Sequence, residues 1–269
     1  MRVPLPESLR DDLANRTAEP ALTVDAATVM LLRDGVDGVE AYFLRRQRSM
    51  AFAAGMYVFP GGRVDPRDAD TDVAWVGPPP SAWGERLGCD EALARALVCA
   101  AIRETYEEAD VLLAGDADEV VADVSGDDWE ADRRALVGHE VSLASVLARR
   151  GLAVRSDLLG AWAHWITPEF EPRRYDTRFF VAVLPNGQRT RDVSTEADRV
   201  EWLAPSAALR REERGELAMM PPTRVTCHDL ASLPSAATAL TSAPDRRIAP
   251  VMPRVVTDGG EYFLEAELP

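Results

Sequence analysis

The chain of 269 residues contains only three cysteines, three histidines and no long apolar run. Because Cys89, Cys99 and Cys227 are odd in number and form no CxxC pair, they favour reduced thiols over a disulfide framework or a zinc knuckle. No stretch reaches the roughly 18 apolar residues of a membrane span, and the N-terminus lacks the apolar segment of a signal peptide. We therefore expect a cytoplasmic protein that does not associate with membranes.

Basic residues are scarce relative to acidic ones. The 45 Asp and Glu residues outnumber the 30 Lys and Arg residues and give a formal net charge of −15. Such a surface repels phosphate backbones and anionic lipid, which argues against nucleic acid as a partner. His139, His164 and His228 form no HxxxH or HExxH pattern, so structural roles are favoured for them over zinc ligation. No P-loop or dinucleotide-binding glycine motif is present either.

The sequence nevertheless has the composition of a globular domain, with 46% apolar residues. Two strand-like runs at 26–33 and 39–46 flank the turn-rich DGVDG and predict a hairpin, and GMYVF predicts a third strand. The polar, proline-rich segment at about 69–89 is typical of a long loop or an inserted segment. A helix is predicted from Asp90, which can cap its N-terminus, and two further helices are predicted at about 127–150.

The helix after Asp90 carries an unusual group of acidic residues in the stretch AAIRETYEEADVLL. Glu104, Glu107 and Glu108 are three and four positions apart and share one face, and Arg103 lies one turn from Glu107. Like charges at this spacing repel unless a cation neutralises them, and hard carboxylate oxygens suit Mg²⁺ or Mn²⁺. The pattern alone leaves two interpretations open, a metal site or a solvated acidic face partly paired with Arg103.

Together with the upstream stretch FPGGRVDPRD, this helix resembles the box of the Nudix hydrolase family. That box reads Gly, five residues, Glu, seven residues, then Arg-Glu-U-x-Glu-Glu-x-Gly-U, with U an aliphatic residue. Gly62 matches the leading glycine and Asp68 the first acidic position. The second half is matched by Arg103, Glu104, Glu107, Glu108 and Val111. Asp68 and Arg103 are 35 positions apart, where the box has eight, so about 27 residues are inserted.

Two further positions depart from the box. Thr105 stands at the aliphatic position, and Asp110 stands where the box has glycine. A residue that closes a helix often needs a positive φ, which Asp tolerates better than most residues. The insertion and these substitutions leave the carboxylates of the helix in place, so they affect the expected loop geometry more than the expected chemistry.

The resemblance implies a Nudix fold of the α/β (α+β) class, in which a mixed β-sheet is sandwiched between helices. It covers most of the chain, and we expect a single domain over residues 1–269. The stretches GAWAHWITP, DTRFFVAVLP and DRVEWLAP fit the later strands of the sheet. The stretch PSAALRREERG fits a helix on the other face at about 205–214.

The resemblance also implies Mg²⁺- or Mn²⁺-dependent hydrolysis of a nucleoside diphosphate linked to another moiety. Glu104, Glu107 and Glu108 would then be the metal ligands. Arg103 would orient Glu104 or Glu107 through a charge-assisted hydrogen bond, which makes Arg103 and Glu104 the expected catalytic residues of the helix.

Three residues outside the helix are also expected at the site. Gly61 and Gly62 would allow the backbone to pass close to the metal-bearing helix, where a Cβ would obstruct it, and would lie against the substrate. Glu196 in DVSTEADRVEWL is a candidate base or additional ligand, since the family often uses an acid from a loop before a late strand. The alternative for Glu196 is a surface acid of a loop.

The stretch LRRQRSMAFAAGMYVFPGG partly resembles the motif that precedes the box in coenzyme A diphosphatases. The matching positions are Arg46, Met50, Gly55 and Phe59, whereas Gln47 and Ala53 replace the usual Ser and His. The resemblance implies that Arg46 binds the substrate. The long insertion and WITPEFEPRRYDTRFF are similar to the peroxisomal-type coenzyme A branch of the family. Coenzyme A or acyl-coenzyme A is therefore the expected substrate, followed by ADP-ribose or a dinucleotide such as NADH. A Nudix-fold regulator that binds a nucleotide without turnover is the alternative of a different class.

Three arginines after WITP are candidates to contact the substrate. Arg173, Arg174 and Arg178 could bind an additional phosphate such as the 3′-phosphate of coenzyme A. The alternative is that they are exposed or paired with Glu169, Glu171 and Asp176. The expected partner is thus a small-molecule nucleotide, and homodimers are common in the family.

Overall fold

The computed structural model describes residues 1–6, 9–36, 38–49 and 53–269. Its main sheet has eight strands among these residues, in the order β11-β3-β2-β10-β9-β12, with β4 paired to β3 and β5 paired to β2. The strands are β2 (Thr23–Gly35), β3 (Gly38–Arg46), β4 (Tyr57–Val58), β5 (Gly61–Arg63), β9 (Leu159–Ile166), β10 (Arg174–Val183), β11 (Ala197–Leu203) and β12 (Pro250–Val251). The β2–β10 and β9–β12 pairs are parallel and the others are antiparallel, so the sheet is mixed.

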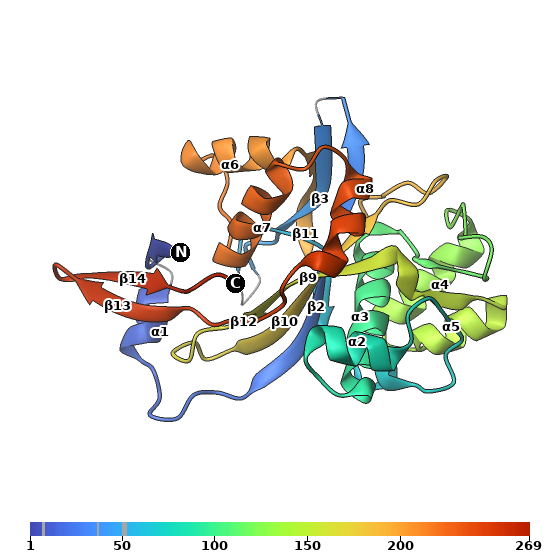
Figure 1. The fold of residues 1–269 in the computed structure, drawn as a ribbon, viewed down its shortest axis with the longest axis horizontal. Coiled ribbons are helices and arrows are strands. Elements are labelled where there is room, and N and C mark those ends of the chain that lie inside the picture. The colour runs from blue at the N-terminus through green and yellow to red at the C-terminus, as the bar shows by residue number, and fades with distance from the viewer. Residues whose placement is uncertain (7–8, 37, 50–52) are drawn as a thin grey trace.

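Helices cover both faces of this sheet (Figure 1). One face carries α2 (Pro80–Leu87), α3 (Glu91–Ala109), α4 (Asp127–Val137) and α5 (Leu143–Arg150), and the other carries α6 (Pro205–Glu213), α7 (Pro221–Ala231) and α8 (Ala236–Ser242). Successive residues of β2 supply the two cores alternately, because side chains along a strand point to opposite faces. Val29 and Leu31 belong to the cluster beneath α3, whereas Met30 and Leu32 belong to the cluster beneath α6–α8. The predicted sheet sandwiched between helices is confirmed.

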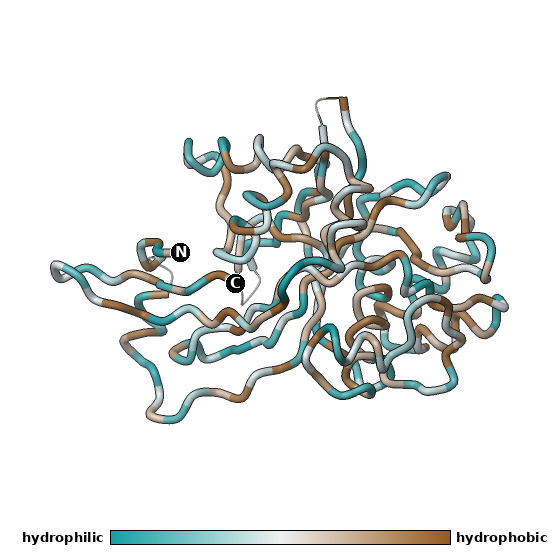
Figure 2. Tube along the Cα trace, in the orientation of Figure 1, coloured by the Kyte–Doolittle hydropathy of each residue, from teal (hydrophilic) through white to brown (hydrophobic). Residues whose placement is uncertain are grey.

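Two small sheets flank the main one. The first joins the two ends of the chain and consists of β1 (Arg2–Pro4), β14 (Glu261–Glu265) and β13 (Arg254–Asp258), with the short helix α1 (Arg10–Ala14) nearby. The second consists of β6 (Trp75–Val76), β8 (Ala153–Arg155) and β7 (Ala114–Gly115). Figure 2 shows polar and apolar stretches interspersed along the chain. None of the helices in the described residues is both long and apolar enough to cross a membrane.

The helix α3 places the predicted acidic residues. Its N-terminus is capped by Asp90, whose side chain accepts a hydrogen bond from the Leu93 N–H at 2.8 Å. It ends at Asp110, which has φ of 57° and donates its N–H to the Tyr106 carbonyl oxygen. The substitution of aspartate for the glycine of the box therefore keeps the left-handed helix end. Thr105 is fully buried at the aliphatic position, and its hydroxyl donates to the Ala101 carbonyl oxygen at 2.7 Å.

Most of the predicted elements are present, and one prediction was wrong. The hairpin of β2 and β3, the helices α4 and α5 and the helix α6 are confirmed. The inserted segment at about 69–89, which was expected to be a loop, contains β6 and α2. The proline Pro80 begins α2, and Trp83 and Leu87, one turn apart, are buried in the core beneath α3. A helix of eight residues with so few apolar positions has too little periodicity to stand out in the sequence.

Candidate active site

A cavity of about 1440 Å³ lies beside α3 and β5 and extends to the loop between β9 and β10. Its walls include most of the residues predicted for the site, which are Arg46, Gly61, Gly62, Arg103, Glu104, Glu107, Glu108, Arg173, Arg174 and Glu196. These residues come from segments far apart in the chain. The fold thus brings the acidic helix, the glycine pair and the loop before β11 to one cavity. Met50 of the preceding motif lies outside the described residues.

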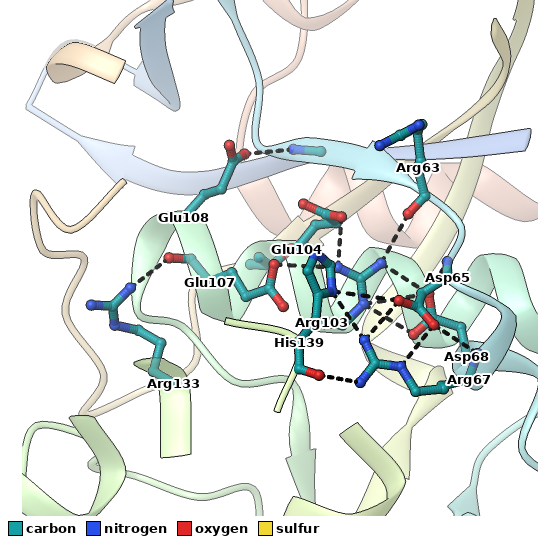
Figure 3. Close-up of polar contacts among 12 residues, drawn as sticks. Arg63, Asp65, Arg67, Asp68, Arg103, Glu104, Glu107, Glu108, Arg133 and His139 are labelled. Carbon is teal, nitrogen blue, oxygen red and sulfur yellow. Dashed lines mark hydrogen bonds and ion pairs between the residues drawn. The ribbon is translucent and has the colours of Figure 1, made fainter. Parts of the chain in front are cut away.

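Arg103 is the buried centre of the polar contacts in this wall (Figure 3). Its Nε and Nη2 atoms donate to the Asp68 carboxylate at 3.0 and 2.9 Å, and Nη2 also donates to the Arg63 carbonyl oxygen at 2.9 Å. Its Nη1 atom donates to Glu104 Oε1 at 2.7 Å and to Glu107 Oε2 at 3.2 Å. One guanidinium therefore holds two carboxylates of α3 and the acidic residue at the start of the box.

The glycine pair brings the backbone against these carboxylates. The Gly61 N–H donates to Glu108 Oε2 at 2.8 Å. A Cβ on Gly62 would lie 2.5 Å from Glu104 Oε1, and a Cβ on Gly61 would lie 2.5 Å from the Ala27 carbonyl oxygen. Any side chain at either position would therefore displace the helix carboxylates or the neighbouring strand.

Burial makes it costly for the three glutamates to be ionised together. It raises the pKa of Glu104 to about 7, although the adjacent Arg103 acts in the opposite direction. Burial and the neighbouring Glu104 carboxylate raise the pKa of Glu108 well above its ordinary value. The pKa of Glu107 is also raised by burial, and its Oε1 atom is buried without a hydrogen-bond partner among the described residues.

These side chains fit a divalent cation chemically. The donor set consists of carboxylate oxygens, which Mg²⁺ and Mn²⁺ prefer, and it includes one buried oxygen that lacks a partner. In the arrangement of the described residues, no three His, Cys, Asp or Glu side chains are positioned to hold a metal ion. Arg103 Nη1 lies between Glu104 and Glu107 instead. Binding of a cation would thus require Glu104 and Glu107 to turn away from Arg103. Arg103 would then keep Asp68 as its partner.

Glu196 lies at the edge of the same carboxylate group. Its Oε2 atom accepts a hydrogen bond from Arg46 Nη2 at 3.0 Å, and about half of its side chain is exposed. The charge of Glu196 contributes to the raised pKa of Glu108, and the charge of Arg46 opposes it. Glu196 and Arg46 are therefore close enough to Glu108 to act on it electrostatically, and both line the cavity.

The three arginines after β9 have different environments. Arg173 is exposed, lines the cavity and makes no hydrogen bond or ion pair with the described residues. Arg174 also lines the cavity but donates to the carbonyl oxygens of Thr167 and Ala21, at 3.1 and 2.8 Å. Arg178 is buried, contacts Asp176 and does not line the cavity.

The prediction that Arg178 contacts the substrate is therefore not supported by its position. Side chains alternate along β10, so that Phe179 belongs to the core beneath α6–α8 and Phe180 to the core beneath α3. Arg178 shares the side of Phe180, lies opposite His164 of β9 and has its Nη1 atom 3.7 Å from Asp25 Oδ1. The alternative of an ion pair with Asp176 is the arrangement observed.

Several cavity or supporting residues were not predicted from the sequence. Arg63 lines the cavity next to Gly62, and its side chain makes no hydrogen bond or ion pair with the described residues (Figure 3). Arg133 of α4 is buried and donates to the Glu107 carbonyl oxygen at 2.9 Å and to Glu130 at 2.8 Å. Glu171 is a buried carboxylic acid in the cavity wall. For Arg63 the sequence offered one signal, its position beside the glycine pair. The roles of Arg133 and Glu171 depend on contacts across the fold.

The family of the chain follows from a comparison with known proteins. The model of the NUDT19 Nudix domain matches residues 81–230, which is more than half of the chain and includes α3 and Glu196. The chain belongs to the Nudix family. The Nudix match begins inside the inserted segment, so the glycine pair and Asp68 precede it.

Individual Nudix proteins are similar to the chain over much of its length. The acyl-coenzyme A diphosphatase NUDT19 of Gallus gallus is 27% identical over 231 residues, covering 68% of this chain and 58% of the relative. Its Xenopus laevis counterpart is 24% identical, covering 68% and 57% respectively. The chain thus spans less than three fifths of the length of these curated relatives. The crystal structure of a NUDIX hydrolase from Alicyclobacillus acidocaldarius superposes with a TM-score of 0.71 at 30% identity, covering 82% of this chain and 96% of that one.

Proposed function

We propose that the protein hydrolyses the diphosphate linkage of an adenine nucleotide derivative, with coenzyme A or acyl-coenzyme A as its preferred substrate. The observation that carries this proposal is the cavity wall in which Glu104 and Glu107 accept hydrogen bonds from the Arg103 guanidinium and Glu108 accepts one from the Gly61 N–H. Such a costly group of buried carboxylates serves no purpose in packing, whereas it suits a cation that in turn binds a diphosphate. The family of the chain supports the reaction type.

In this proposal Glu104, Glu107 and Glu108 hold Mg²⁺ or Mn²⁺. A cation held by these residues would supply positive charge to the diphosphate and make a nearby water more acidic. Arg103 orients Glu104 and Glu107 and is itself fixed by Asp68. The Gly61 N–H holds Glu108 in place through its hydrogen bond.

The remaining residues act on the water and on the substrate. Glu196, held by Arg46, takes a proton from the attacking water. The water oxygen bonds to one phosphorus, and the bridging oxygen leaves with the other phosphate. Arg63 and Arg173 supply unpaired cationic groups along the same cavity for further phosphate oxygens.

The preference for coenzyme A is supported by Arg173 and by the relatives that are acyl-coenzyme A diphosphatases. Arg173 is free to bind an additional phosphate, whereas Arg174 and Arg178 already have protein partners. Of the three arginines predicted to bind the substrate, we therefore propose this role for Arg173. Arg174 is its neighbour in the cavity wall.

The test is mass spectrometry of the products from a mixed pool of coenzyme A, acyl-coenzyme A, ADP-ribose and NADH with Mg²⁺. We expect 3′,5′-ADP together with 4′-phosphopantetheine or its acyl form. Faster cleavage of ADP-ribose or NADH would contradict the substrate preference. Binding of these nucleotides without cleavage of any of them would identify the protein as a regulator and contradict the hydrolase proposal.

A further inference from the structure

The cavity has a second region that the proposed hydrolysis does not use. It is lined by the loop between β9 and β10, by Pro253 and by Leu264 of β14. In Figure 1 the strand β14 lies away from α3. The lining of this region is mainly apolar and aromatic, with residues such as Leu9, Trp165, Phe179 and Leu264. This composition suits a flat organic group better than a phosphate.

One acidic side chain lies within this apolar wall. Glu171 lines the cavity, although only 4% of its surface is exposed. Its carboxyl group makes no hydrogen bond and no ion pair within 4 Å to any residue that the structure describes. Arg174 attracts this group, but the donors of Arg174 are directed to the carbonyl oxygens of Thr167 and Ala21. Asp12 repels the ionised form of Glu171.

A largely buried carboxyl group without a protein partner is unfavourable unless a water or a ligand in the cavity satisfies it. Burial raises the pKa of Glu171 to about 7, so the protonated form is well populated at neutral pH. A protonated carboxyl group presents a hydrogen-bond donor and an acceptor side by side. Adenine presents the complementary pair, because its amino group lies next to a ring nitrogen acceptor.

We propose that Glu171 recognises the adenine base of the nucleotide through the 6-amino group and an adjacent ring nitrogen. The aromatic side chains of Trp165 and Phe179 form part of the apolar wall against which the base lies. Arg173, two positions along the same loop, is then placed for a phosphate on the ribose of the same nucleoside. This inference rests on the proposed function in one respect, which is that every candidate substrate contains an ADP group.

The test compares binding of ADP and of purine riboside 5′-diphosphate, which lacks the 6-amino group, by isothermal titration calorimetry. The parent protein should bind ADP on the order of tenfold more tightly than the analogue. Glu171→Leu should bind the two ligands equally, within about twofold. Glu171→Gln should keep the preference, because its amide presents the same donor and acceptor. Glu169→Gln, an exposed position in the same loop, is the matched control and should behave as the parent.

The inference is overturned if the parent protein does not distinguish the two ligands or binds neither. It is also overturned if Glu171→Leu retains the full preference for ADP. The parent comparison needs no variant, so a failure of Glu171→Leu to fold does not affect it. Failure of the proposed function is a separate result, namely absence of diphosphate cleavage by a parent protein that still discriminates between the two ligands.

Discussion

Glu104→Gln should make the metal-free protein more stable at alkaline pH while removing activity. In the folded protein the pKa of Glu104 is about 7, compared with an ordinary value of 4.5. The folded state therefore binds this proton more tightly than the unfolded chain, and stability is lost as the pH rises from 4.5 through 7. The rise in pKa corresponds to about 3 kcal/mol. A glutamine carries no charge at any pH and keeps an oxygen that accepts from Arg103.

The measurement is thermal unfolding of the parent protein and of Glu104→Gln at pH 5 and pH 8 in the presence of a chelator. The two proteins should have similar stability at pH 5, where Glu104 is protonated. At pH 8 the variant should be more stable by about 3 kcal/mol, or on the order of 6 °C in Tm for a chain of this size. Glu85→Gln on the exposed surface of α2 is the control and should show no such dependence.

Millimolar Mg²⁺ should reverse this order at pH 8. A cation held by the native carboxylates would relieve their repulsion, so Mg²⁺ should raise the Tm of the parent protein more than that of the variant. A Glu104→Gln protein that is less stable than the parent at pH 8 without metal would refute the reasoning, because it would show that the charge of Glu104 stabilises the fold.

Three further predictions concern activity. Glu107→Gln and Glu108→Gln should each lower kcat by about a hundredfold with unchanged circular dichroism, and activity within a few-fold of the parent in both would contradict the metal role. Arg133→Met should lower kcat by about tenfold and raise the Mg²⁺ concentration required, because it frees the Glu107 carbonyl oxygen, whereas exposed Arg134→Ala should change neither. Coenzyme A should exceed dephospho-coenzyme A in kcat/KM by about tenfold to a hundredfold, and Arg173→Ala should remove that difference; equal rates in the parent protein would show that Arg173 does not bind the 3′-phosphate.

The acidic helix could be predicted because its signals are local. The cap at Asp90, the spacing of the glutamates and the helix end at Asp110 all depend on residues within a few positions of one another. The same locality explains why the hairpin of β2 and β3 was predicted. Each of these elements is specified before any contact across the fold forms.

The residues that were missed depend on contacts that no local pattern reports. Arg133 contacts Glu107 across 26 positions, and Glu171 becomes significant only because it is buried in the wall of a cavity. Arg178 was assigned to the substrate because it follows Arg173 and Arg174 in a basic stretch. The alternation of β10 places it on the side of the sheet opposite to Thr177 and Phe179, which line the cavity, a distinction that requires the strand register.

The insertion shows which features of the Nudix box this fold requires. Asp68 and Arg103 remain joined by a buried ion pair at 2.9 Å although 35 positions separate them. Asp68 is fixed locally, since its carboxylate accepts from the Asp65 N–H in the first turn of a short helix at Pro66–Ala69. Lengthening a loop about fourfold costs only about 1 kcal/mol in closure entropy. Burial of Trp83 against the core beneath α3 offsets a cost of that size, because a buried aromatic side chain contributes about 2 kcal/mol or more. The contact between Asp68 and Arg103, rather than their spacing in the sequence, therefore defines the box in this protein.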